Sequence, residues 1–311
     1  MDGIRRRAFV VGMLGAASAA CTAGGLPPDG NGDASPSARG AALLAVKIDN
    51  VGAARPQTGL QDADIVYAEQ VEGGLSRLMA VFGSRLPDVV GPVRSARETD
   101  LELLAQFDRP TLAFSGAQGR LLPLIDAASL RAKSPAEAGG AYFRGGDRPA
   151  PHNLFLRPGR LGRTTSGTNA GTAAGFRFAA RAPADGRAAA ERTVRFPSAR
   201  FTFTWAAGQG RWRVSMDGRP AVTSTGERLT AATAVVQYVD IQPSRFHDKL
   251  GNTSPLSRTV GTGKALVLRD GRVYDARWER PAAADPTTFT TADGTPLPFA
   301  PGPVWVVFTK A

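Results

Sequence analysis

The chain has 311 residues, of which 42% are hydrophobic and 21% charged, and its formal net charge is +11. This is an ordinary globular composition, long enough to bury a sizeable core in one large domain or two smaller ones. The single cysteine, Cys21, excludes a disulfide framework and a thiolate metal cluster.

Residues 1–20 have the pattern of an export signal peptide. Three arginines precede an apolar run from Ala8 to Ala20, which ends in small residues before Cys21. The run is shorter than the roughly 20 residues that cross a bilayer as a helix, so we expect no transmembrane anchor. Residues 6–10 also resemble a twin-arginine signal, and the choice between Tat and Sec export is open.

The residues just before Cys21 resemble the end of a bacterial lipobox, in which the cysteine becomes the lipidated first residue. Ser18 departs from the large aliphatic residue that usually begins the box. We therefore predict palmitate-type lipidation at Cys21 and attachment to the extracellular face of a bacterial cell membrane. A plain secretory signal with an incidental cysteine is the alternative.

Cleavage before Cys21 removes three arginines and one aspartate and leaves a net charge of +9. A basic protein of the bacterial envelope meets phospholipid head groups, teichoic-type polymers and phosphorylated cell-wall precursors, whereas nucleic acid is not an expected partner. The alternative explanation is arginine usage in a GC-rich genome, so the net charge alone does not decide the ligand.

The composition predicts five segments after and including the signal. Residues 21–40 are rich in Gly, Pro, Ser and Asp and are expected to be a disordered tether. Residues 164–193 are similarly poor in large apolar residues and are expected to link two domains. These are an α/β domain over 41–163 and a β-rich domain over 194–311.

The first domain alternates short apolar runs with helix signals, a pattern typical of a mixed sheet with crossover helices. A Gly73–Gly74 turn between two apolar runs predicts a hairpin. Thr58 and Gln61 fit a capping box. The expected strands are 42–49, 64–72, 75–82, 88–93 and 110–115, and the expected helices are about 95–107 and 118–126.

The second domain has a different pattern, with short β-rich runs separated by Asp-Gly or Gly turns, as in residues 200–206, 211–218 and 264–271. These are hairpin signals at close spacing, and they predict an antiparallel sheet.

Arg94 and Arg97 lie where the helix of the first domain is expected to begin. Ser95 fits the N-cap and Glu98 the N3 position of a capping box, at the carboxyl end of a strand. A helix start carries positive partial charge, so two arginines there call for a negative partner. That partner is either a phosphate or carboxylate ligand or an internal acid, namely Glu72, Glu69 or Asp49.

Other polar residues fall at expected strand ends and loops. His152, one of two histidines, lies in a Gly/Pro-rich loop and is a candidate general acid or base, with Asp147 or Glu72 as its orienting partner. A loop histidine bonded to backbone is the alternative. The candidate catalytic residues are therefore Asp49, Glu72 and His152, and the candidate ligand-binding residues are Arg55, Arg77, Arg94, Ser95, Arg97 and Asn153.

The motifs of common enzymes are missing from the sequence. There is no G-x-S-x-G or H-E-x-x-H run, and the "GTGKA" of residues 261–265 lacks both the first glycine and the Ser/Thr of a phosphate-binding loop. No cofactor is therefore predicted for a binding protein, and the metal is unknown. A divalent cation such as Mg²⁺ is considered only for an enzyme.

Several long motifs resemble the YerB-type bacterial lipoproteins, a family of unknown function. They include "KIDN", "ARPQTGLQDADIVYAEQVEGGLSRLMAVF", "GPVRSAR", "DRPAPHNL", "AVVQYVD", "GTGKALVLRDGRV" and "PGPVWV". The resemblance implies a two-part chain and lipidation at Cys21, but no reaction. It implies a polar signature at Asp49, Asn50, Arg55, Glu72, Arg77, Arg94, Ser95, Arg97, His152, Asn153 and Asp240.

A weaker similarity links the first domain to the LytR-CpsA-Psr phosphotransferases, which move anionic polymers from lipid carriers to peptidoglycan. It implies roles for Asp49, Arg55, Asp64, Arg94 and Arg97, although the arginine and aspartate motifs of those enzymes differ here.

Three functions follow as hypotheses. The chain binds an anionic glycan or lipid-linked precursor through its arginines, or it is an envelope enzyme that transfers phosphoryl or glycosyl-phosphate groups. The third hypothesis is an adaptor whose β-rich part docks a protein partner that the sequence does not identify.

Overall fold

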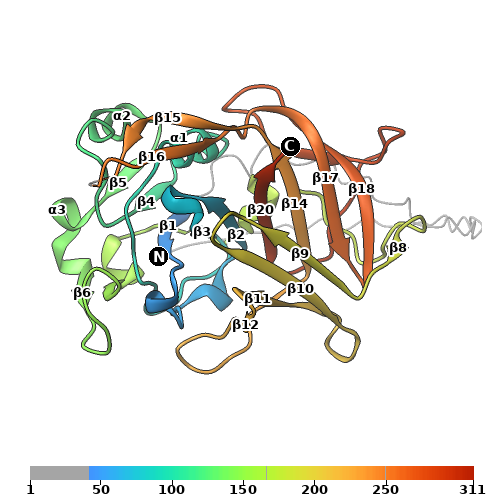
Figure 1. The fold of residues 1–311 in the computed structure, drawn as a ribbon, viewed down its shortest axis with the longest axis horizontal. Helices are drawn as coiled ribbons and strands as arrows, with labels where there is room; N and C mark the ends of the chain where they lie inside the picture. The colour runs from blue at the N-terminus through green and yellow to red at the C-terminus, as the bar shows by residue number, and fades with distance from the viewer. Residues whose placement is uncertain (1–41, 166, 249) are drawn as a thin grey trace, which may run out of the picture. The chain divides into compact units, whose positions relative to one another are not determined.

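A computed structural model describes residues 42–165, 167–248 and 250–311 of the chain (Figure 1). The predicted signal peptide, the lipidation site Cys21 and the tether lie outside the described residues. No helix in the described part is long and apolar enough to cross a membrane.

A large mixed sheet dominates the described residues, where it contains eleven strands. Its order is β19-β18-β17-β14-β20-β2-β3-β1-β4-β5, with β8 beside β18. Four neighbouring pairs are parallel, and the others are antiparallel. The strands are β1 (Leu44–Asp49), β2 (Ile65–Gln70), β3 (Ser76–Phe82), β4 (Thr111–Ala113), β5 (Arg131–Lys133), β8 (Arg187–Ala188), β14 (Thr233–Val239), β17 (Gly261–Arg269), β18 (Arg272–Arg280), β19 (Thr288–Thr290) and β20 (Val304–Lys310).

Strand β20 lies at the centre of the sheet, between β2 of the predicted first domain and β14 of the predicted second domain, and is parallel to both. The sheet therefore continues from the predicted first domain into the predicted second one. Residues 164–193, expected as a linker, contain the short helix α4 (Ala170–Ala173), strand β8 and the start of β9.

The remaining strands form smaller antiparallel sheets. Two hairpins, β6–β7 and β15–β16, stand apart from the sheets and carry loops of the site described below (Figure 1). The strands are β6 (Tyr142–Arg144), β7 (Leu154–Leu156), β9 (Glu191–Arg195), β10 (Arg200–Ala206), β11 (Arg211–Met216), β12 (Arg219–Pro220), β13 (Thr230–Ala231), β15 (Ile241–His247) and β16 (Thr253–Ser257).

The main sheet is buried on both faces, as alternation along its central strands requires. Trp305 and Val307 of β20 face one apolar cluster, which includes Phe203 of β10 and Trp212 of β11. Val306 and Phe308 face a second cluster under helix α1. Burial on both faces explains why β1 and β20 read as nearly continuous apolar runs.

The fold has less helix than the sequence indicated. The helices of the described residues besides α4 are α1 (Glu98–Leu104), α2 (Leu122–Ala127) and α3 (Pro135–Ala138), with short 3₁₀ turns at residues 52–54, 60–62, 72–74, 139–141, 158–161 and 207–209. The mixed sheet and the antiparallel sheets are present, but the α/β description of the first domain overstated its helical content.

Two predicted capping boxes are wrong. Thr58 does not cap a helix, because Gly59 precedes only a 3₁₀ turn and the Thr58 hydroxyl donates to Ser224 Oγ at 2.9 Å. Helix α1 begins at Glu98 rather than after Ser95, and its Asp100 carboxylate accepts from the Arg97 backbone N–H at 2.7 Å.

The late start of α1 has a backbone cause. Arg94 O accepts from Ser115 N at 3.0 Å, and Ala96 N donates to Gly116 O at 2.9 Å. These bonds hold residues 94–96 extended beside the chain that follows β4, so a helix cannot begin before Arg97. With only seven residues and its own acidic cap, α1 offers no anion site at its N-terminus.

The Gly73–Gly74 prediction is confirmed in its main feature, since β2 and β3 are antiparallel neighbours joined at this turn. Both glycines have positive φ, 67° and 70°, which L-residues adopt with strain. A Cβ on Gly74 would also lie 2.5 Å from Pro197 Cβ. The turn therefore needs glycine, and it fixes the backbone of Glu72 beside it.

Candidate functional site

A cavity of about 1190 Å³ lies beside the end of β1. Its walls come from the β2–β3 turn, residues 94–98, the loop after β4, the β6–β7 hairpin at the left of Figure 1, and the β15–β16 hairpin at its top. Of the sequence-predicted residues it brings together Asp49, Glu72, Arg77, Arg94, Ser95, Arg97 and His152.

Asp49 is the shared anion of two cavity residues. It ends β1 and is 2% exposed, and its Oδ2 atom lies 3.0 Å from Arg94 Nε and 2.9 Å from His152 Nδ1. The backbone explains how Arg94 reaches it. Asp49 N donates to Pro92 O and Arg94 N donates to Lys47 O, so residues 92–94 run along the end of β1, beyond its pairing with β4 at residues 44–46.

Arg97 and Glu72 form a two-pronged ion pair. Arg97 Nε and Nη2 lie 2.6 and 2.8 Å from the two Glu72 oxygens, and Arg97 Nη1 donates to Ala96 O at 3.0 Å. Glu72 also accepts from Ser254 Oγ on β16. Burial opposes ionisation of Glu72, but the bonds and charge of Arg97 outweigh it and hold the pKa of Glu72 below its usual range.

Arg77 is the buried arginine of the cavity that lacks a carboxylate among the described residues. It is 9% exposed and donates from Nη1 to Ser95 O at 3.1 Å, and no carboxylate of the described residues lies within 4.0 Å of its guanidinium. Burial lowers the pKa of Arg77 to about 10, and the charges of Arg97 and Arg94 act in the same direction. Glu72 and Asp49 offset this only in part.

Four arginines line the cavity: Arg144 donates to Asn153, and the other three, Arg77, Arg94 and Arg97, share the carboxylates of Asp49 and Glu72. Arg94 Nε is paired with Asp49 by charge at 3.0 Å but is buried without a hydrogen bond, and within the described residues the two Nη groups of Arg94 have no hydrogen-bond partner. Its side chain is 25% exposed. The internal ion pairs predicted as the alternative to a ligand are present for both arginines, Arg97 with Glu72 and Arg94 with Asp49, but they leave donors of Arg94 and Arg77 unused.

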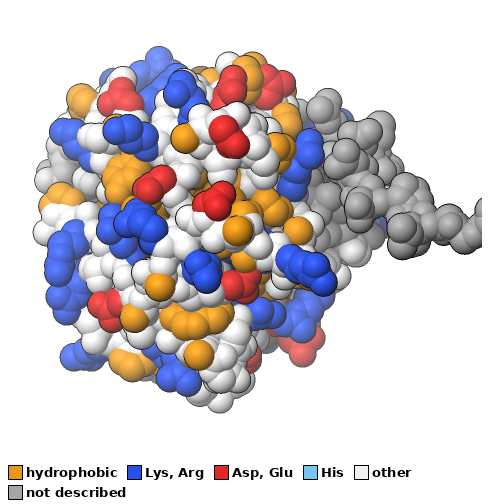
Figure 2. Space-filling view, turned by 90° about the vertical axis from the view of Figure 1, so that its right-hand side faces the viewer, with side chains coloured by type: hydrophobic (Ala, Val, Ile, Leu, Met, Phe, Trp, Pro, Cys, Tyr) orange, Lys and Arg blue, Asp and Glu red, His pale blue; other side chains and the backbone are white. Residues whose placement is uncertain are grey.

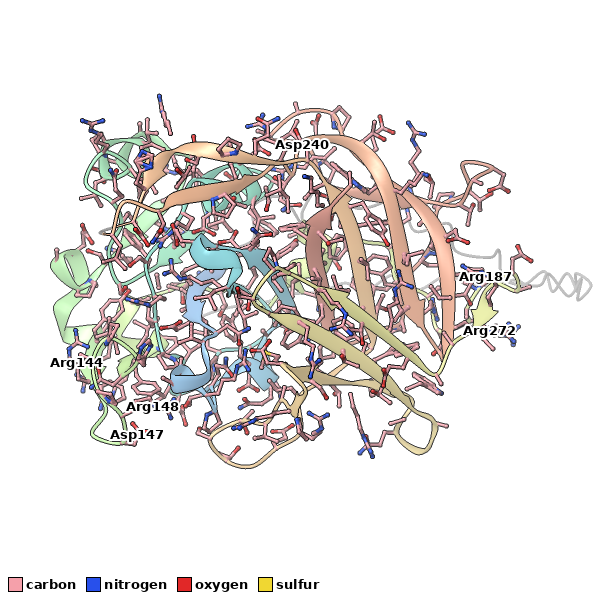
Figure 3. All side chains as sticks on the ribbon, in the orientation of Figure 1. Arg144, Asp147, Arg148, Arg187, Asp240 and Arg272 are labelled. Atoms are coloured by element: carbon pink, nitrogen blue, oxygen red, sulfur yellow. The ribbon has the colours of Figure 1, made fainter. Side chains whose placement is uncertain are left out.

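His152 is positioned by the loop between β6 and β7. Arg148, in the same loop, donates from Nη1 to Ala54 O at 2.6 Å and to Pro56 O at 3.2 Å, and so ties the loop to the chain that follows β1. Arg148 and its neighbour Asp147 lie together at this edge (Figure 3). The predicted partners of His152 are wrong, because Asp147 pairs with Arg148, and Asp49 contacts the ring instead.

Two predicted ligand-binding residues do not line the cavity. Arg55 pairs with Asp217 at 2.8 Å and donates to Asn50 O at 2.6 Å. Asn153 accepts from Arg144 Nη1 at 2.7 Å and donates to Gly145 O, so it braces the base of the His152 loop. Both act on the backbone around the cavity rather than on its contents.

Ser95 lines the cavity, but through its backbone and not as a cap. Its carbonyl oxygen accepts from Arg77, and Arg97 Nη1 lies 3.4 Å from the same oxygen. Asp240 of the family signature is outside the cavity, in the turn between β14 and β15, where its carbonyl accepts from Arg258 N (Figure 3).

Asp64, implied by the phosphotransferase similarity, is also outside the cavity. Its two oxygens accept from Gly83 N, Ser84 N, Ser84 Oγ, Asn169 Nδ2 and Ala170 N. A carboxylate with five donors clamps the end of β3 to α4 and has no lone pair left for a substrate. The residues carried over from that similarity are therefore not assembled in one place.

The sequence interpretation missed a buried charge cluster next to the cavity. Lys47 of β1 is fully buried and contacts both Glu69 of β2 and Asp100 of α1, the latter at 2.7 Å. Burial raises the pKa of Glu69 to about 7, with a further contribution from the Asp100 charge, although Lys47 opposes the shift. The signal was a lysine inside the otherwise apolar run of residues 42–48.

The described residues contain no group of three or more His, Cys, Asp or Glu arranged to hold a metal ion. Asp49 and Glu72, the acids nearest to such a role, are each paired with an arginine. We therefore assign no step to Mg²⁺.

Comparisons with known proteins identify a family. Residues 30–171 match "Protein of unknown function (DUF3048) N-terminal domain", and residues 192–306 match the corresponding C-terminal domain. A protein of Bacillus subtilis (strain 168) named "Putative lipoprotein YerB" is 26% identical over 278 residues, which are 85% of this chain and 80% of that protein.

The crystal structure of the YerB protein from Bacillus subtilis has a similar fold, with a TM-score of 0.71 and 21% sequence identity. The similarity covers 89% of this chain and 93% of that one. The resemblance inferred from the motifs is confirmed, and the chain belongs to the DUF3048 family of YerB-type bacterial lipoproteins.

Proposed function

We propose that this chain is a cell-envelope lipoprotein whose cavity binds an anionic ligand, with a phosphate or carboxylate group held by Arg94 and Arg77. The observation that supports it most is Arg77, a buried arginine that lines the cavity without a carboxylate partner. Burying a charge without a partner costs free energy. An anion bound in the cavity would offset that cost, and this contributes to its affinity.

Arg94 adds the recognition geometry. Its Nε lies 3.0 Å from Asp49 Oδ2 but is buried without a hydrogen bond, and its Nη groups have no hydrogen-bond partner among the described residues. A planar guanidinium with free Nη groups is suited to bidentate contact with a phosphate or carboxylate. Arg97, saturated by Glu72 and by carbonyl oxygens, contributes charge but no spare fork.

The outer surface does not offer a competing site on the face drawn in Figure 2. Lys and Arg side chains there are interspersed with Asp, Glu and uncharged side chains and form no continuous basic patch. The high net charge is therefore not the reason for the proposal, which rests on the arrangement inside the cavity.

Calorimetric titration with three sugars tests the proposal. N-acetylglucosamine 1-phosphate offers a phosphate, N-acetylmuramic acid offers a carboxylate, and N-acetylglucosamine offers neither. We expect binding of at least one charged sugar, no binding of the neutral one, and a loss of about tenfold or more with Arg94→Gln. Arg195→Gln is the matched control, because Arg195 is exposed on β9, outside the cavity. Equal affinity for charged and neutral sugars would contradict the proposal.

The His152–Asp49 contact supports a second candidate, an envelope enzyme that transfers phosphoryl or glycosyl-phosphate groups. An imidazole oriented by a buried carboxylate is the usual form of a general base, and Arg94 lies at the same carboxylate. In this candidate His152 takes a proton from an attacking hydroxyl, which forms a bond to the phosphorus while the pyrophosphate bond to the lipid carrier breaks. The carrier phosphate leaves with the electron pair of that bond, and the arginines stabilise the charge on the phosphate. Incubation with undecaprenyl-linked anionic polymer tests it: turnover by the native chain but not by His152→Gln is expected, and no turnover across several carriers would exclude it.

Lipid anchoring at Cys21 is part of the proposal. It is supported by the lipobox-like sequence and by the name of the Bacillus subtilis relative. Metabolic labelling with palmitate in a bacterial host is expected to mark the native chain and not Cys21→Ala. Label that survives the substitution would exclude this anchor.

A further inference from the structure

The cavity is lined by exposed leucines as well as by arginines. Among the described residues, three large hydrophobic side chains are exposed: Leu75 (38%), Leu122 (40%) and Leu250 (87%). Isolated exposed leucines are ordinary on protein surfaces. Leu75 and Leu250, however, line the same cavity as the unpaired arginine, whereas Leu122 does not.

Leu75 lies close to Arg77 in the sequence and in the cavity. It precedes β3 in an extended conformation, two residues before Arg77, and both side chains line the cavity. Side chains two apart on an extended chain are on the same side. The apolar and the cationic groups are therefore neighbours in one cavity rather than separate sites.

Leu250 is presented by a braced turn. The Asp248 carboxylate accepts from the backbone N–H groups of Leu250 and Asn252 at 2.8 and 2.9 Å and from Asn252 Nδ2 at 2.9 Å. These bonds hold the backbone of Leu250 and Asn252 against Asp248, and the Leu250 side chain is exposed. Phe246, nearer the base of the same hairpin, is buried and also lines the cavity.

A simple ion would occupy only a small part of the cavity. Pockets for drug-sized ligands usually measure about 300–1,000 Å³, and this cavity has about 1190 Å³. A phosphate on Arg94 and Arg77 would leave most of that volume, including the wall formed by Leu121, Phe246 and Leu250, in contact with something else.

We infer that the occupant is an anionic amphiphile, with a phosphate head at Arg94 and Arg77 and a hydrocarbon chain that leaves the cavity between Leu75 and Leu250. This inference rests on the proposed function and names the ligand class of the same site. The head group satisfies the buried Arg77, and the chain covers the exposed leucines.

Three probes separate the head from the chain. Glycerol 3-phosphate carries the head alone, lauroyl lysophosphatidic acid carries the same head with a twelve-carbon chain, and monolaurin carries the chain without phosphate. Each is titrated below its critical micelle concentration into Cys21→Ala chain, which has no lipid of its own to compete. We expect the lysophosphatidic acid to bind about 100-fold more tightly than glycerol 3-phosphate and more tightly than monolaurin.

Two kinds of variant locate the two contributions. Leu250→Ser changes a side chain that is 87% exposed, so folding is not at risk, and it is expected to remove about tenfold of the advantage of the acyl chain while affinity for glycerol 3-phosphate is unchanged. Leu75→Ser is expected to act in the same way. Leu122→Ser, matched in exposure to Leu75 but outside the cavity, is expected to change nothing.

The outcomes distinguish this inference from the proposed function. Equal affinity for glycerol 3-phosphate and lysophosphatidic acid would overturn the amphiphile and leave the anion site standing. Monolaurin as tight as lysophosphatidic acid would overturn the phosphate head and the anion site together. Absence of binding by all three probes, with no charged sugar bound either, would overturn both.

Discussion

Asp49 and His152, 103 residues apart in the sequence, are in direct contact through Oδ2 and Nδ1 at 2.9 Å. The contact exists because the β6–β7 loop is tied back to the chain that follows β1. A carboxylate only accepts hydrogen bonds, so it selects the form of the ring that carries a proton on Nδ1. This leaves Nε2 as the nitrogen available to a ligand or substrate.

The tautomer is a measurable consequence. At about pH 9, where an ordinary histidine with a pKa near 6.5 is neutral, ¹⁵N spectra are expected to show His152 protonated on Nδ1. The chain has two histidines, and His247, which is exposed and has no side-chain hydrogen bond among the described residues, serves as the internal reference. Asp49→Ala is expected to move His152 toward the pattern of His247. Identical spectra for the two rings in the native chain would refute the assignment.

Arg77 is expected to cost stability in exchange for function. Because its folded-state pKa is depressed to about 10, the charged form is less favourable inside the protein than in water. Arg77→Met should therefore raise the free energy of unfolding at pH 7 by about 1–3 kcal/mol, and Ser95 O keeps a donor in Arg97. Urea denaturation measures the change.

The same variant should lose ligand-linked stabilisation. A bound anion raises the unfolding midpoint of the native chain, and Arg77→Met should no longer respond to the charged sugar or lysophosphatidic acid that binds the native chain. Arg195→Met, an exposed substitution outside the cavity, should change the free energy of unfolding by less than about 0.5 kcal/mol. Destabilisation by Arg77→Met would mean that its hydrogen bond outweighs its burial.

Much of the main sheet could be predicted from local pattern, and its assembly could not. The apolar run of β1 and the Gly73–Gly74 turn are local signals, and both are present in the fold. The insertion of β20 between β2 and β14 depends on the pairing of β20 with β2, whose residues are more than 200 positions away in the sequence. Local propensity contains no information on such a register.

The site also has features that local sequence pattern could predict and others that depend on the tertiary structure. Arg94 was expected near an acid, because a strand end and a helix start were recognisable, but the helix start itself was misplaced. Ser95 is a good cap by type, yet the backbone bonds of residues 94–96 to residues 115–116 decided the conformation. His152 was recognised by rarity and loop context, whereas its partner required the three-dimensional path of the β6–β7 loop.

The buried Lys47–Glu69–Asp100 cluster predicts a specific pH dependence. The folded chain holds the Glu69 proton more tightly than the unfolded chain, since the pKa rises from 4.5 to about 7 on folding. The associated stabilisation is complete below the unfolded pKa and is lost as the pH rises through the folded one. The native chain should therefore lose up to about 3 kcal/mol of this contribution between pH 4.5 and pH 7.5.

Glu69→Gln removes the titrating group while keeping a side chain of the same shape. The difference between the native and variant free energies of unfolding, measured in urea at several pH values, should follow that fall. Glu72 contributes in the opposite direction as the pH falls, but it is present in both chains and cancels in the difference. A difference that does not change between pH 4.5 and 7.5 would show that Glu69 stays ionised beside Lys47.

Arg148 does not line the cavity, but its bonds to the chain that follows β1 hold the loop that carries His152. Arg148→Ala removes the bonds to Ala54 O and Pro56 O, each worth about 1 kcal/mol or more when a charged donor is involved. Hydrogen exchange of the loop between β6 and β7 should accelerate about tenfold or more, and the Nδ1 signature of His152 should weaken.

Arg187 provides the contrast, since it also pairs with an aspartate, Asp275 at 3.0 Å, on the opposite side of Figure 3. Its side chain and that of Asp275 are 67% and 73% exposed, and such surface pairs contribute about 0–1 kcal/mol. Arg187→Ala should therefore leave both the exchange rates of the His152 loop and the histidine spectra unchanged. If Arg148→Ala behaves like Arg187→Ala, the loop is held by its own turn and by Asn153, and the contact between Asp49 and His152 does not depend on Arg148.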